Sequence, residues 1–206
     1  MRQRVLSFLI FVAFVFSGCA VHTAPSGSGD SVVDFQSPLK TLPNSYGPIE
    51  MTEEKLKPLE SVCQSFKKLQ MAPRFSIPEL RVLARETHVS PVAVSRCNVR
   101  VLKAFVATDW TPLVVLKSPV GPGRTCWAVI GYQESDEELI LTDPINRGRT
   151  TRMKYPKVLK QWADPQKTCL LIFSRYVGEE RIKRTLKEYF SEQRVEEIPI
   201  RTAERR

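Results

Sequence analysis

The sequence has few histidines, few glycines and no hydrophobic run long enough to cross a bilayer. Only 2 histidines occur among its 206 residues, and no combination of histidine and cysteine has the spacing of a zinc site. None of the 9 glycines belongs to a glycine-rich loop between a strand and a helix, which excludes the common nucleotide-binding motifs. The glycine and proline contents are also too low for a fibrous or wholly disordered chain. We therefore expect a globular protein with no metal and no cofactor.

The residues that are present are typical of one folded domain. Hydrophobic residues make up 42% of the chain and charged residues 26%, and the length suffices for one full core but not for two ordinary domains. The formal net charge is +9, but the basic residues are scattered among acidic ones. Such a pattern is typical of a solvated mixed-charge surface, and we expect no nucleic-acid partner.

The N-terminal segment resembles the signal peptide of a bacterial lipoprotein. Two arginines, Arg2 and Arg4, precede an apolar run over residues 5–16, which is shorter than the ~20 residues of a spanning helix and suits a signal peptide. Small residues then lead directly into Cys19, as in the lipobox of these proteins. The resemblance implies a signal peptide over residues 1–18, cleavage before Cys19, and acylation of Cys19.

The next segment predicts a flexible tether between this anchor and the folded module. Residues 25–30 are rich in serine and glycine, and prolines recur up to residue 48, so we assign residues 19–50 to the tether. Several acyl chains on Cys19 would hold the protein stably on a lipid bilayer. We expect it in the cell envelope, on the outer membrane facing the periplasm where the bacterium has one. The alternative is an ordinary signal peptide or an uncleaved anchor.

Three helices are predicted in the first half of the module, which spans residues 51–176. Thr52 can cap the first, although Pro58 is also suited to the first turn of a helix that starts later. Ser76 and Glu79 form a capping box at the start of the second, and Asn98 can cap the third. The apolar stripe of the first helix has spacings of three and four and comprises Leu56, Leu59, Val62, Cys63, Phe66 and Leu69.

The second half of the module changes to a strand pattern. Apolar runs predict strands over residues 113–116, 126–132, 139–142 and 169–173, with a short helix around residues 158–162. Helices followed by hairpin-linked strands indicate an α+β fold with an antiparallel sheet. Residues 177–206 are expected to form an appended C-terminal helix and a tail that is poorly ordered from Glu196 onward. One side of this helix would carry Ile182, Leu186, Tyr189 and Phe190.

Residues 111–162 resemble the bacteriocin-processing, double-glycine-leader peptidase family. The pattern consists of Pro112 before an apolar strand, an aromatic and apolar strand that ends in Gly131 and Tyr132, a strand that ends at Asp143 before a proline, and Trp162 in a following helix. The resemblance extends over about residues 50–175 when the helices are included. It implies a papain-like cysteine peptidase fold, in which a helix with a nucleophilic cysteine packs on a sheet that carries histidine and aspartate.

The sequence departs from this family at the catalytic positions. A thiol has a pKa of about 8.5 and is mostly protonated at neutral pH, so a nucleophilic cysteine needs a neighbouring imidazole to take its proton. The family's histidine position is occupied by Cys126, so Asp143 has no imidazole to orient and is better explained as a turn-forming residue. The family's nucleophile would fall near Leu59, and the nearest thiol is that of Cys63. Gln36, the only glutamine between Cys19 and Cys63, lies in the tether.

These departures leave three functions open. The first is a catalytically inactive peptidase-like domain that binds a peptide or an envelope protein. The second is an active cysteine peptidase that uses Cys63 or Cys126, with His88 as a substitute base; a thiol within hydrogen-bond reach of His88 would favour it. The third is a structural subunit of an envelope assembly, which an exposed apolar stripe on the C-terminal helix would favour.

Four further cysteines make disulfides a reasonable expectation for an exported protein. Cys63, Cys97, Cys126 and Cys169 permit three pairings. We expect Cys63–Cys97 and Cys126–Cys169, because the first two lie at predicted helices and the last two on predicted strands. A bridge at Cys126 would give the replacement of the family's histidine a structural meaning.

Overall fold

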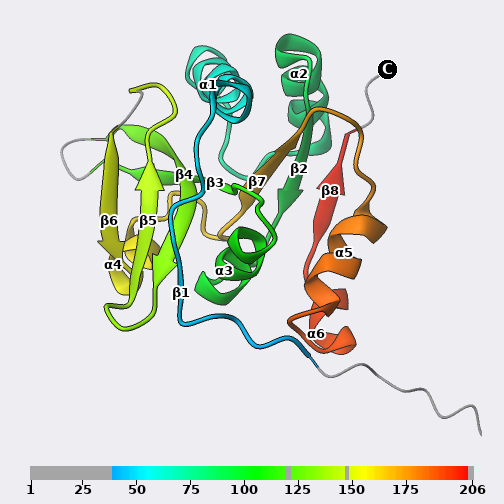
Figure 1. Ribbon diagram of the computed structural model, residues 1–206. Helices are drawn as coiled ribbons and strands as arrows, with labels where there is room; N and C mark the ends of the chain where they lie inside the picture. The colour runs from blue at the N-terminus through cyan, green and yellow to red at the C-terminus, as the bar shows by residue number, and fades with distance from the viewer. Residues whose placement is uncertain (1–38, 119–121, 147–148, 204–206) are drawn as a thin grey trace, which may run out of the picture. The chain divides into compact units, whose positions relative to one another are not determined.

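An antiparallel sheet with helices on both faces forms the centre of the molecule (Figure 1). The structure is a computed structural model that describes residues 39–118, 122–146 and 149–203. The expectations for the signal segment, Cys19, Gln36 and most of the tether lie outside these residues. The elements are β1 (Ser45–Tyr46), α1 (Glu53–Lys68), α2 (Ile77–Thr87), β2 (Ser90–Val94), α3 (Val99–Ala107), β3 (Leu113–Lys117), β4 (Arg124–Gln133), β5 (Glu138–Thr142), β6 (Thr150–Lys154), α4 (Tyr155–Gln161), β7 (Cys169–Phe173), α5 (Glu179–Lys187), α6 (Glu192–Glu196) and β8 (Ile200–Thr202).

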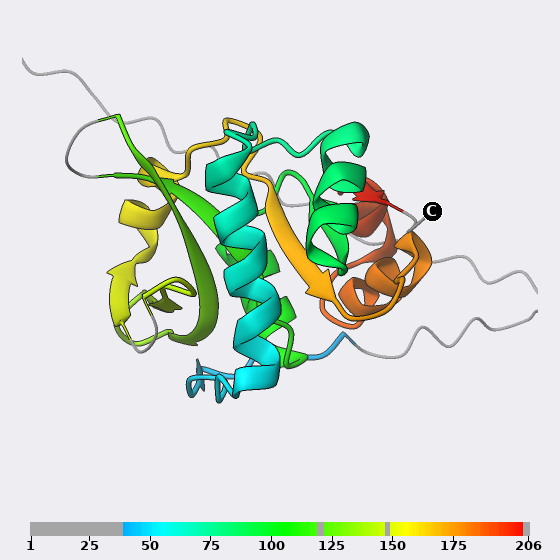
Figure 2. The same ribbon diagram turned by 90° about the horizontal axis from the view of Figure 1, so that it is seen from above.

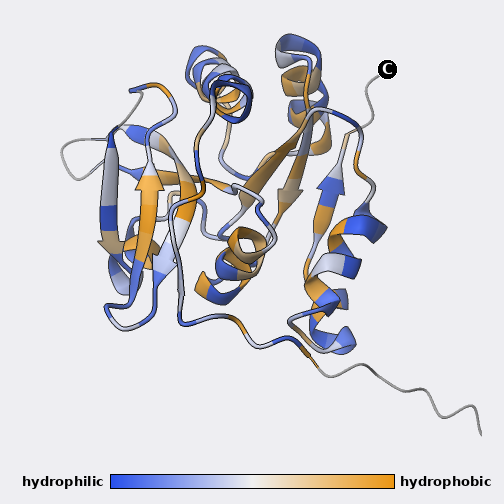
Figure 3. Ribbon diagram, viewed as in Figure 1, coloured by the Kyte–Doolittle hydropathy of each residue, from blue (hydrophilic) through white to orange (hydrophobic). Residues whose placement is uncertain are grey.

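The strand order in the sheet is β6-β5-β4-β3-β7-β2-β8, with β1 paired to β4. The helices α1 and α2 lie over one face, and α3, α5 and α6 lie on the other (Figure 1). Seen from above, α1 runs across the sheet with α2 beside it (Figure 2). Hydrophobic residues gather on β5 and on the inner sides of the helices (Figure 3). The predicted α+β class is therefore confirmed. Within the described ranges, no helix is both long and apolar enough to cross a bilayer.

The predicted helix starts agree with the structure except at Pro58. The capping box of Ser76 and Glu79 is present, and the side chain of Asn98 accepts a hydrogen bond from the amide of Val101 at 3.0 Å. Thr52 is the N-cap residue of α1 but makes no side-chain capping bond. The alternative start at Pro58 is wrong, because α1 already begins at Glu53 and Pro58 lies inside it.

The sequence patterns missed four strands, β1, β2, β6 and β8, and two of them, β2 and β6, lack the usual strand pattern. All five residues of β2 are buried, but it contains Pro91, and proline is rare inside strands. The proline is tolerated because the pairing with β8 starts only at Val92, so its missing N–H removes no bond from that ladder. The other strand, β6, lies at the opposite edge of the sheet, and its residues alternate between exposed and half-buried, so it has no apolar run.

The expected tether over residues 19–50 is wrong for its last part, because residues 45–49 pack on the domain. Tyr46 pairs with Tyr132 of β4, and the two rings stack at 6.3 Å between centroids. The amide of Ile49 donates to the carbonyl of Ile130 at 2.6 Å. A Cβ atom on Gly131 would lie 2.8 Å from the carbonyl oxygen of Tyr46. The glycine of the family's Gly-Tyr pair therefore makes room for β1.

The C-terminal segment is part of the same core rather than an appended helix with a loose tail. The four apolar side chains of the predicted stripe are buried, but α5 ends at Lys187. The chain continues through α6 into β8, which pairs with β2. Arg201 of β8 donates to the hydroxyl of Ser95 at 2.6 Å and to the carbonyl of Arg74 at 3.1 Å. The expectation of poor order from Glu196 onward is therefore wrong, since strand pairing fixes Ile200–Thr202.

Candidate functional site

The three catalytic candidates that the family resemblance suggests, Cys63, Cys126 and Asp143, come together between α1 and the sheet. Cys63 lies on the buried face of α1, Cys126 lies near the start of β4, and Asp143 directly follows β5, the neighbour of β4. Their exposed fractions are 0%, 4% and 4%. The thiol of Cys126 and the carboxylate of Asp143 both act electrostatically on the thiol of Cys63. The fold thus assembles one cluster from residues that are up to 80 positions apart in the sequence.

The electrostatics of this cluster oppose ionisation of Cys63. Burial raises the pKa of the Cys63 thiol well above its ordinary value. A side-chain hydrogen bond with Cys126 raises it further, and so do the negative charges of Cys126 and Asp143, while Lys67 has a smaller opposing effect. A nucleophilic cysteine needs the reverse, a lowered pKa in a partly exposed and electropositive place. Cys63 is therefore a neutral, buried thiol at neutral pH.

The carboxylate of Asp143 is used to form a turn. One oxygen, Oδ1, accepts hydrogen bonds from the amides of Ile145 and Asn146 at 2.9 and 3.2 Å. The other, Oδ2, accepts from the side-chain amide of Asn146 at 2.7 Å. These bonds fix the chain after β5, as expected of an aspartate before a proline. The turn-forming interpretation of Asp143 is confirmed.

The histidine that could replace the missing base lies elsewhere. His88 is the C-cap residue of α2, where it has a left-handed backbone with φ of 57°, and it is exposed. It is not among the groups that alter the pKa of Cys63. The other histidine, His22, lies outside the described residues. In the part of the chain that the structure describes, no hydrogen bond joins an imidazole to Cys63 or Cys126.

The expected disulfide pairing is wrong, because the sheet places the cysteines in two other pairs. All four cysteines have free thiols. Cys126 lies opposite Val115 of β3, whereas Cys169 lies opposite the adjacent residue, Val114. Since successive side chains of a strand point to opposite faces, Cys126 and Cys169 project from opposite faces of the sheet. Cys126 meets Cys63, and the Sγ atom of Cys169 lies 3.4 Å from that of Cys97.

The aromatic residues of the family pattern belong to the core and its border. Tyr132 and Trp162 are 0% and 4% exposed, and the indole of Trp162 donates to the carbonyl of Thr168 at 3.2 Å. Trp127 is half-buried, with the guanidinium of Arg149 6.0 Å from the centre of its ring. As expected from the sequence, Tyr132 and Trp162 are core residues, and Trp127 packs against the core.

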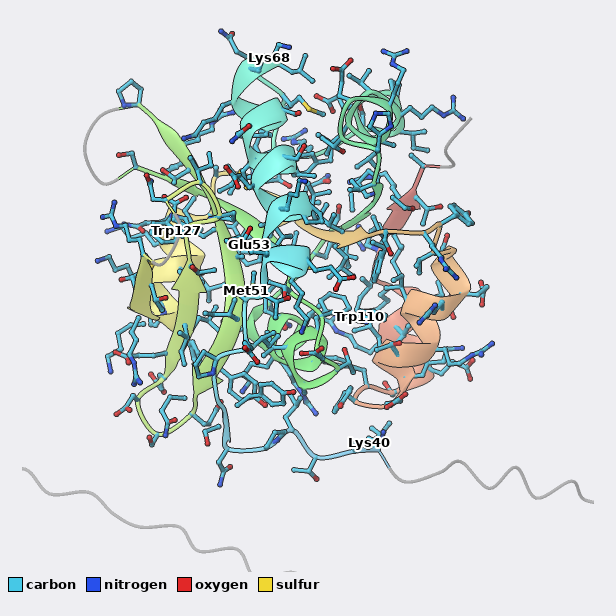
Figure 4. All side chains as sticks on the ribbon, turned by 45° about the horizontal axis from the view of Figure 1, so that its top comes forward. Lys40, Met51, Glu53, Lys68, Trp110 and Trp127 are labelled. Carbon is cyan, nitrogen blue, oxygen red and sulfur yellow. The ribbon has the colours of Figure 1, made fainter. Side chains whose placement is uncertain are left out.

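A groove of about 410 Å³ lies beside the first turns of α1. Its aromatic wall is formed by Trp110, which contacts Phe173 edge-on at 5.3 Å and stacks on Phe105 at 5.9 Å between ring centroids. Trp110 is labelled in Figure 4, next to the start of α1. Cys63, Cys126 and Asp143 do not line the groove. The lining residues are Thr52, Glu54, Lys55, Pro58, Leu59, Asp109, Trp110, Thr111, Leu171, Ile172, Phe173, Ser174 and Arg181.

The groove lies at the position that the family resemblance assigned to the nucleophile. That position is Leu59, which is one helical turn before Cys63 and lines the groove. No thiol, imidazole or glutamine lines it. It brings together α1, residues 109–111 and the end of β7, which are far apart in the chain, so no local sequence pattern could predict it. The one local signal is Pro58, an unusual residue inside a helix.

The groove also offers polar main-chain groups. Proline has no N–H, so Pro58 cannot donate the helical hydrogen bond to the carbonyl of Glu54, and both residues line the groove. On the rim, Lys55 forms an ion pair with Asp109 at 2.9 Å. The side chain of Arg181 is exposed at the edge contributed by α5. An apolar floor with a rim of both acidic and basic side chains suits an extended peptide better than a small apolar molecule.

No family model matches the chain, and no curated protein matches it. Among solved structures, it is similar to the peptidase domain of Streptococcus ComA, a bi-functional ABC transporter involved in a quorum sensing pathway. The identity is 15%, the TM-score is 0.34, and the match covers 62% of this chain and 98% of that domain. Among the described residues, no group of three or more His, Cys, Asp or Glu could hold a metal ion.

Proposed function

We propose that this chain is a membrane-anchored envelope lipoprotein whose peptidase-like domain has lost catalysis and binds an extended segment of a peptide or envelope protein. The anchor would be acylated Cys19, as the lipobox resemblance implies. The observation that carries the proposal is the cluster of Cys63, Cys126 and Asp143. It joins the thiol nearest to the expected nucleophile position with the residues at the expected histidine and aspartate positions, and it contains a second thiol in place of the imidazole.

The cluster supports inactivity in three ways. A thiol cannot serve as a base with the pKa of about 6.5 that histidine supplies. General-base catalysis typically contributes about 10²–10⁴-fold, and the imidazole also generates the thiolate. Burial of Cys63 and Cys126 at 0% and 4% exposure keeps both thiols away from a substrate carbonyl.

The buried stripe of α5 also removes the exposed apolar surface on which a docking C-terminal helix would depend.

The groove beside α1 supports binding. An extended peptide has one N–H per residue to donate, and the carbonyl of Glu54 can accept one. The aromatic wall of Trp110 and Phe173 can take a large apolar side chain, which is the usual anchor of a peptide in a groove. Arg181 at the edge favours an acidic residue or a C-terminal carboxylate. We therefore expect a ligand with a large apolar residue followed by a negative charge.

The test of inactivity compares the natural chain with Cys126→His. We expect no cleavage of fluorogenic peptides, including those with glycine before the scissile bond, by either protein, because Leu59 rather than a cysteine stands at the groove. Cleavage by the natural chain that disappears in Cys63→Ser or Cys126→Ser would contradict the proposal. Cleavage by Cys126→His alone would show that Cys63 can still act as a nucleophile.

The test of binding uses short fluorescent peptides with a central phenylalanine and either an aspartate or a lysine after it. We expect the acidic peptide to bind more tightly in fluorescence anisotropy, and Arg181→Glu to reverse the preference. The matched control is Arg175→Glu, an exposed arginine outside the groove, which should leave the preference unchanged. Equal binding of both peptides to all three proteins would refute the groove as the binding site.

A further inference from the structure

Two thiols lie close together on the face of the sheet opposite the cluster of Cys63 and Cys126. The Sγ atoms of Cys97 and Cys169 are 3.4 Å apart, and the two residues are 2% and 0% exposed. Cys97 lies in the turn between β2 and α3, and Cys169 is the first residue of β7. The contact joins points that are 72 residues apart in the chain.

The main chain holds both cysteines in place. The amide of Arg96 donates to the carbonyl of Gln166 at 2.7 Å, and the amide of Cys97 donates to the carbonyl of Lys167 at 3.1 Å. Cys169 is also held by the sheet, because it lies opposite Val94 in the antiparallel pairing of β7 with β2. A disulfide has an S–S bond of about 2.05 Å, so the two sulfur atoms need to approach by about 1.4 Å. A rotation of the side chains achieves this distance more readily than a shift of the backbone.

We propose that Cys97 and Cys169 form a disulfide when the chain folds in a thiol-oxidising compartment. The two thiols give up two electrons and two protons to a disulfide oxidant, such as oxidised glutathione, which is reduced to two thiols. An exported protein meets such oxidants, so the bond agrees with the N-terminal segment. It does not depend on the peptide-binding function.

Burial determines when this bond can form. The pKa of the Cys169 thiol is raised well above its ordinary value, first by burial and then by its hydrogen bond with Cys97. Because the thiolate is the reactive form, the folded protein resists oxidation at this site, and burial of both residues keeps an external thiol from reducing the bond once it has formed. The bond therefore forms during folding, before β7 is covered. It ties together the start of α3 and the start of β7, the elements whose other ends lead to the aromatic wall of the groove.

The experiment refolds the full chain from denaturant in a mixture of oxidised and reduced glutathione. Free thiols are then alkylated without reduction, and the digest is analysed by mass spectrometry. We expect a cross-linked peptide that contains Cys97 and Cys169. Because the bond closes a long loop, the oxidised protein should melt about 10 °C above the reduced protein.

The variants separate this pair from the other. The double variant Cys97→Ala and Cys169→Ala should lose the cross-link and its share of the melting shift, whereas Cys63→Ala, the matched control, should keep both. If the double variant does not fold, the peptide map of the natural chain still decides. Complete alkylation of Cys97 and Cys169 after oxidative refolding, or a cross-link from either of them to another cysteine, would overturn the proposal.

Discussion

Replacement of Gly131 by alanine tests why the Gly-Tyr pair is present in β4. The new Cβ atom would lie 2.8 Å from the carbonyl oxygen of Tyr46 and 3.2 Å from that of Gly47, and both of these neighbours are backbone atoms. Ordinary contact begins near 3.4 Å, so β1 would have to retreat by about 0.6 Å. Overpacking of this kind costs about 1–3 kcal/mol.

The retreat of β1 should be visible locally as well as globally. Two main-chain hydrogen bonds lie beside the substituted position. The amide of Ile49 donates to the carbonyl of Ile130, and the amide of Glu134 donates to the carbonyl of Asn44. We expect Gly131→Ala to melt several degrees lower, at about 2–4 °C per kcal/mol for a domain of this size. Hydrogen exchange of the Ile49 amide should accelerate more than that of amides in the centre of the sheet.

A matched control comes from the same contact. Gly47 has no atom within 4 Å of the position of a Cβ, so Gly47→Ala should cost nothing and can gain slightly by restricting the unfolded chain. If Gly131→Ala melts at the same temperature as Gly47→Ala and the Ile49 amide remains protected, β1 is not seated on Gly131. The physical explanation for the Gly-Tyr pair would then be wrong.

Two other predictions concern contacts of Asp164 and Glu134, and a third concerns the proposed anchor at Cys19. The side chain of Asp164 is fully buried and accepts two hydrogen bonds from Thr168. Asp164→Ala should therefore lower the free energy of unfolding in urea by about 3 kcal/mol. A decrease of less than half of that would show that these hydrogen bonds do not stabilise the fold. The hydrogen bond from Lys103 is the chief cause that lowers the pKa of Glu134 below its ordinary value of 4.5. The ionised carboxylate therefore stabilises the fold above pH 4.5, and this stabilisation is lost as the pH falls through the lowered pKa of the folded state. Lys103→Met should flatten that part of the curve of stability against pH. Cys19→Ser should abolish labelling by a fatty-acid probe, and unchanged labelling would refute acylation at Cys19.

The sequence alone predicted most of the helices and the strands β3, β4, β5 and β7, and it identified Cys126 and Asp143 as candidate site residues. Apolar spacing and caps predicted α1, α2 and α3, because a helix with one buried face needs a stripe and a start signal. The residue pattern around Cys126 and Asp143 predicted that the base is missing, since residue identity determines which side chains can accept a proton at neutral pH. These features depend on side-chain chemistry and on neighbours only a few residues away.

The tertiary structure decided which distant residues meet. Strand order and register placed Cys126 and Cys169 on opposite faces of the sheet, which reversed the expected cysteine pairing. Pairing with neighbours made a buried strand of a segment that contains Pro91 and fixed the C-terminal residues through β8. The groove exists only because α1, Trp110 and the end of β7 converge. Contacts of this kind depend on the cooperative packing of the whole chain, which no local pattern in the sequence encodes.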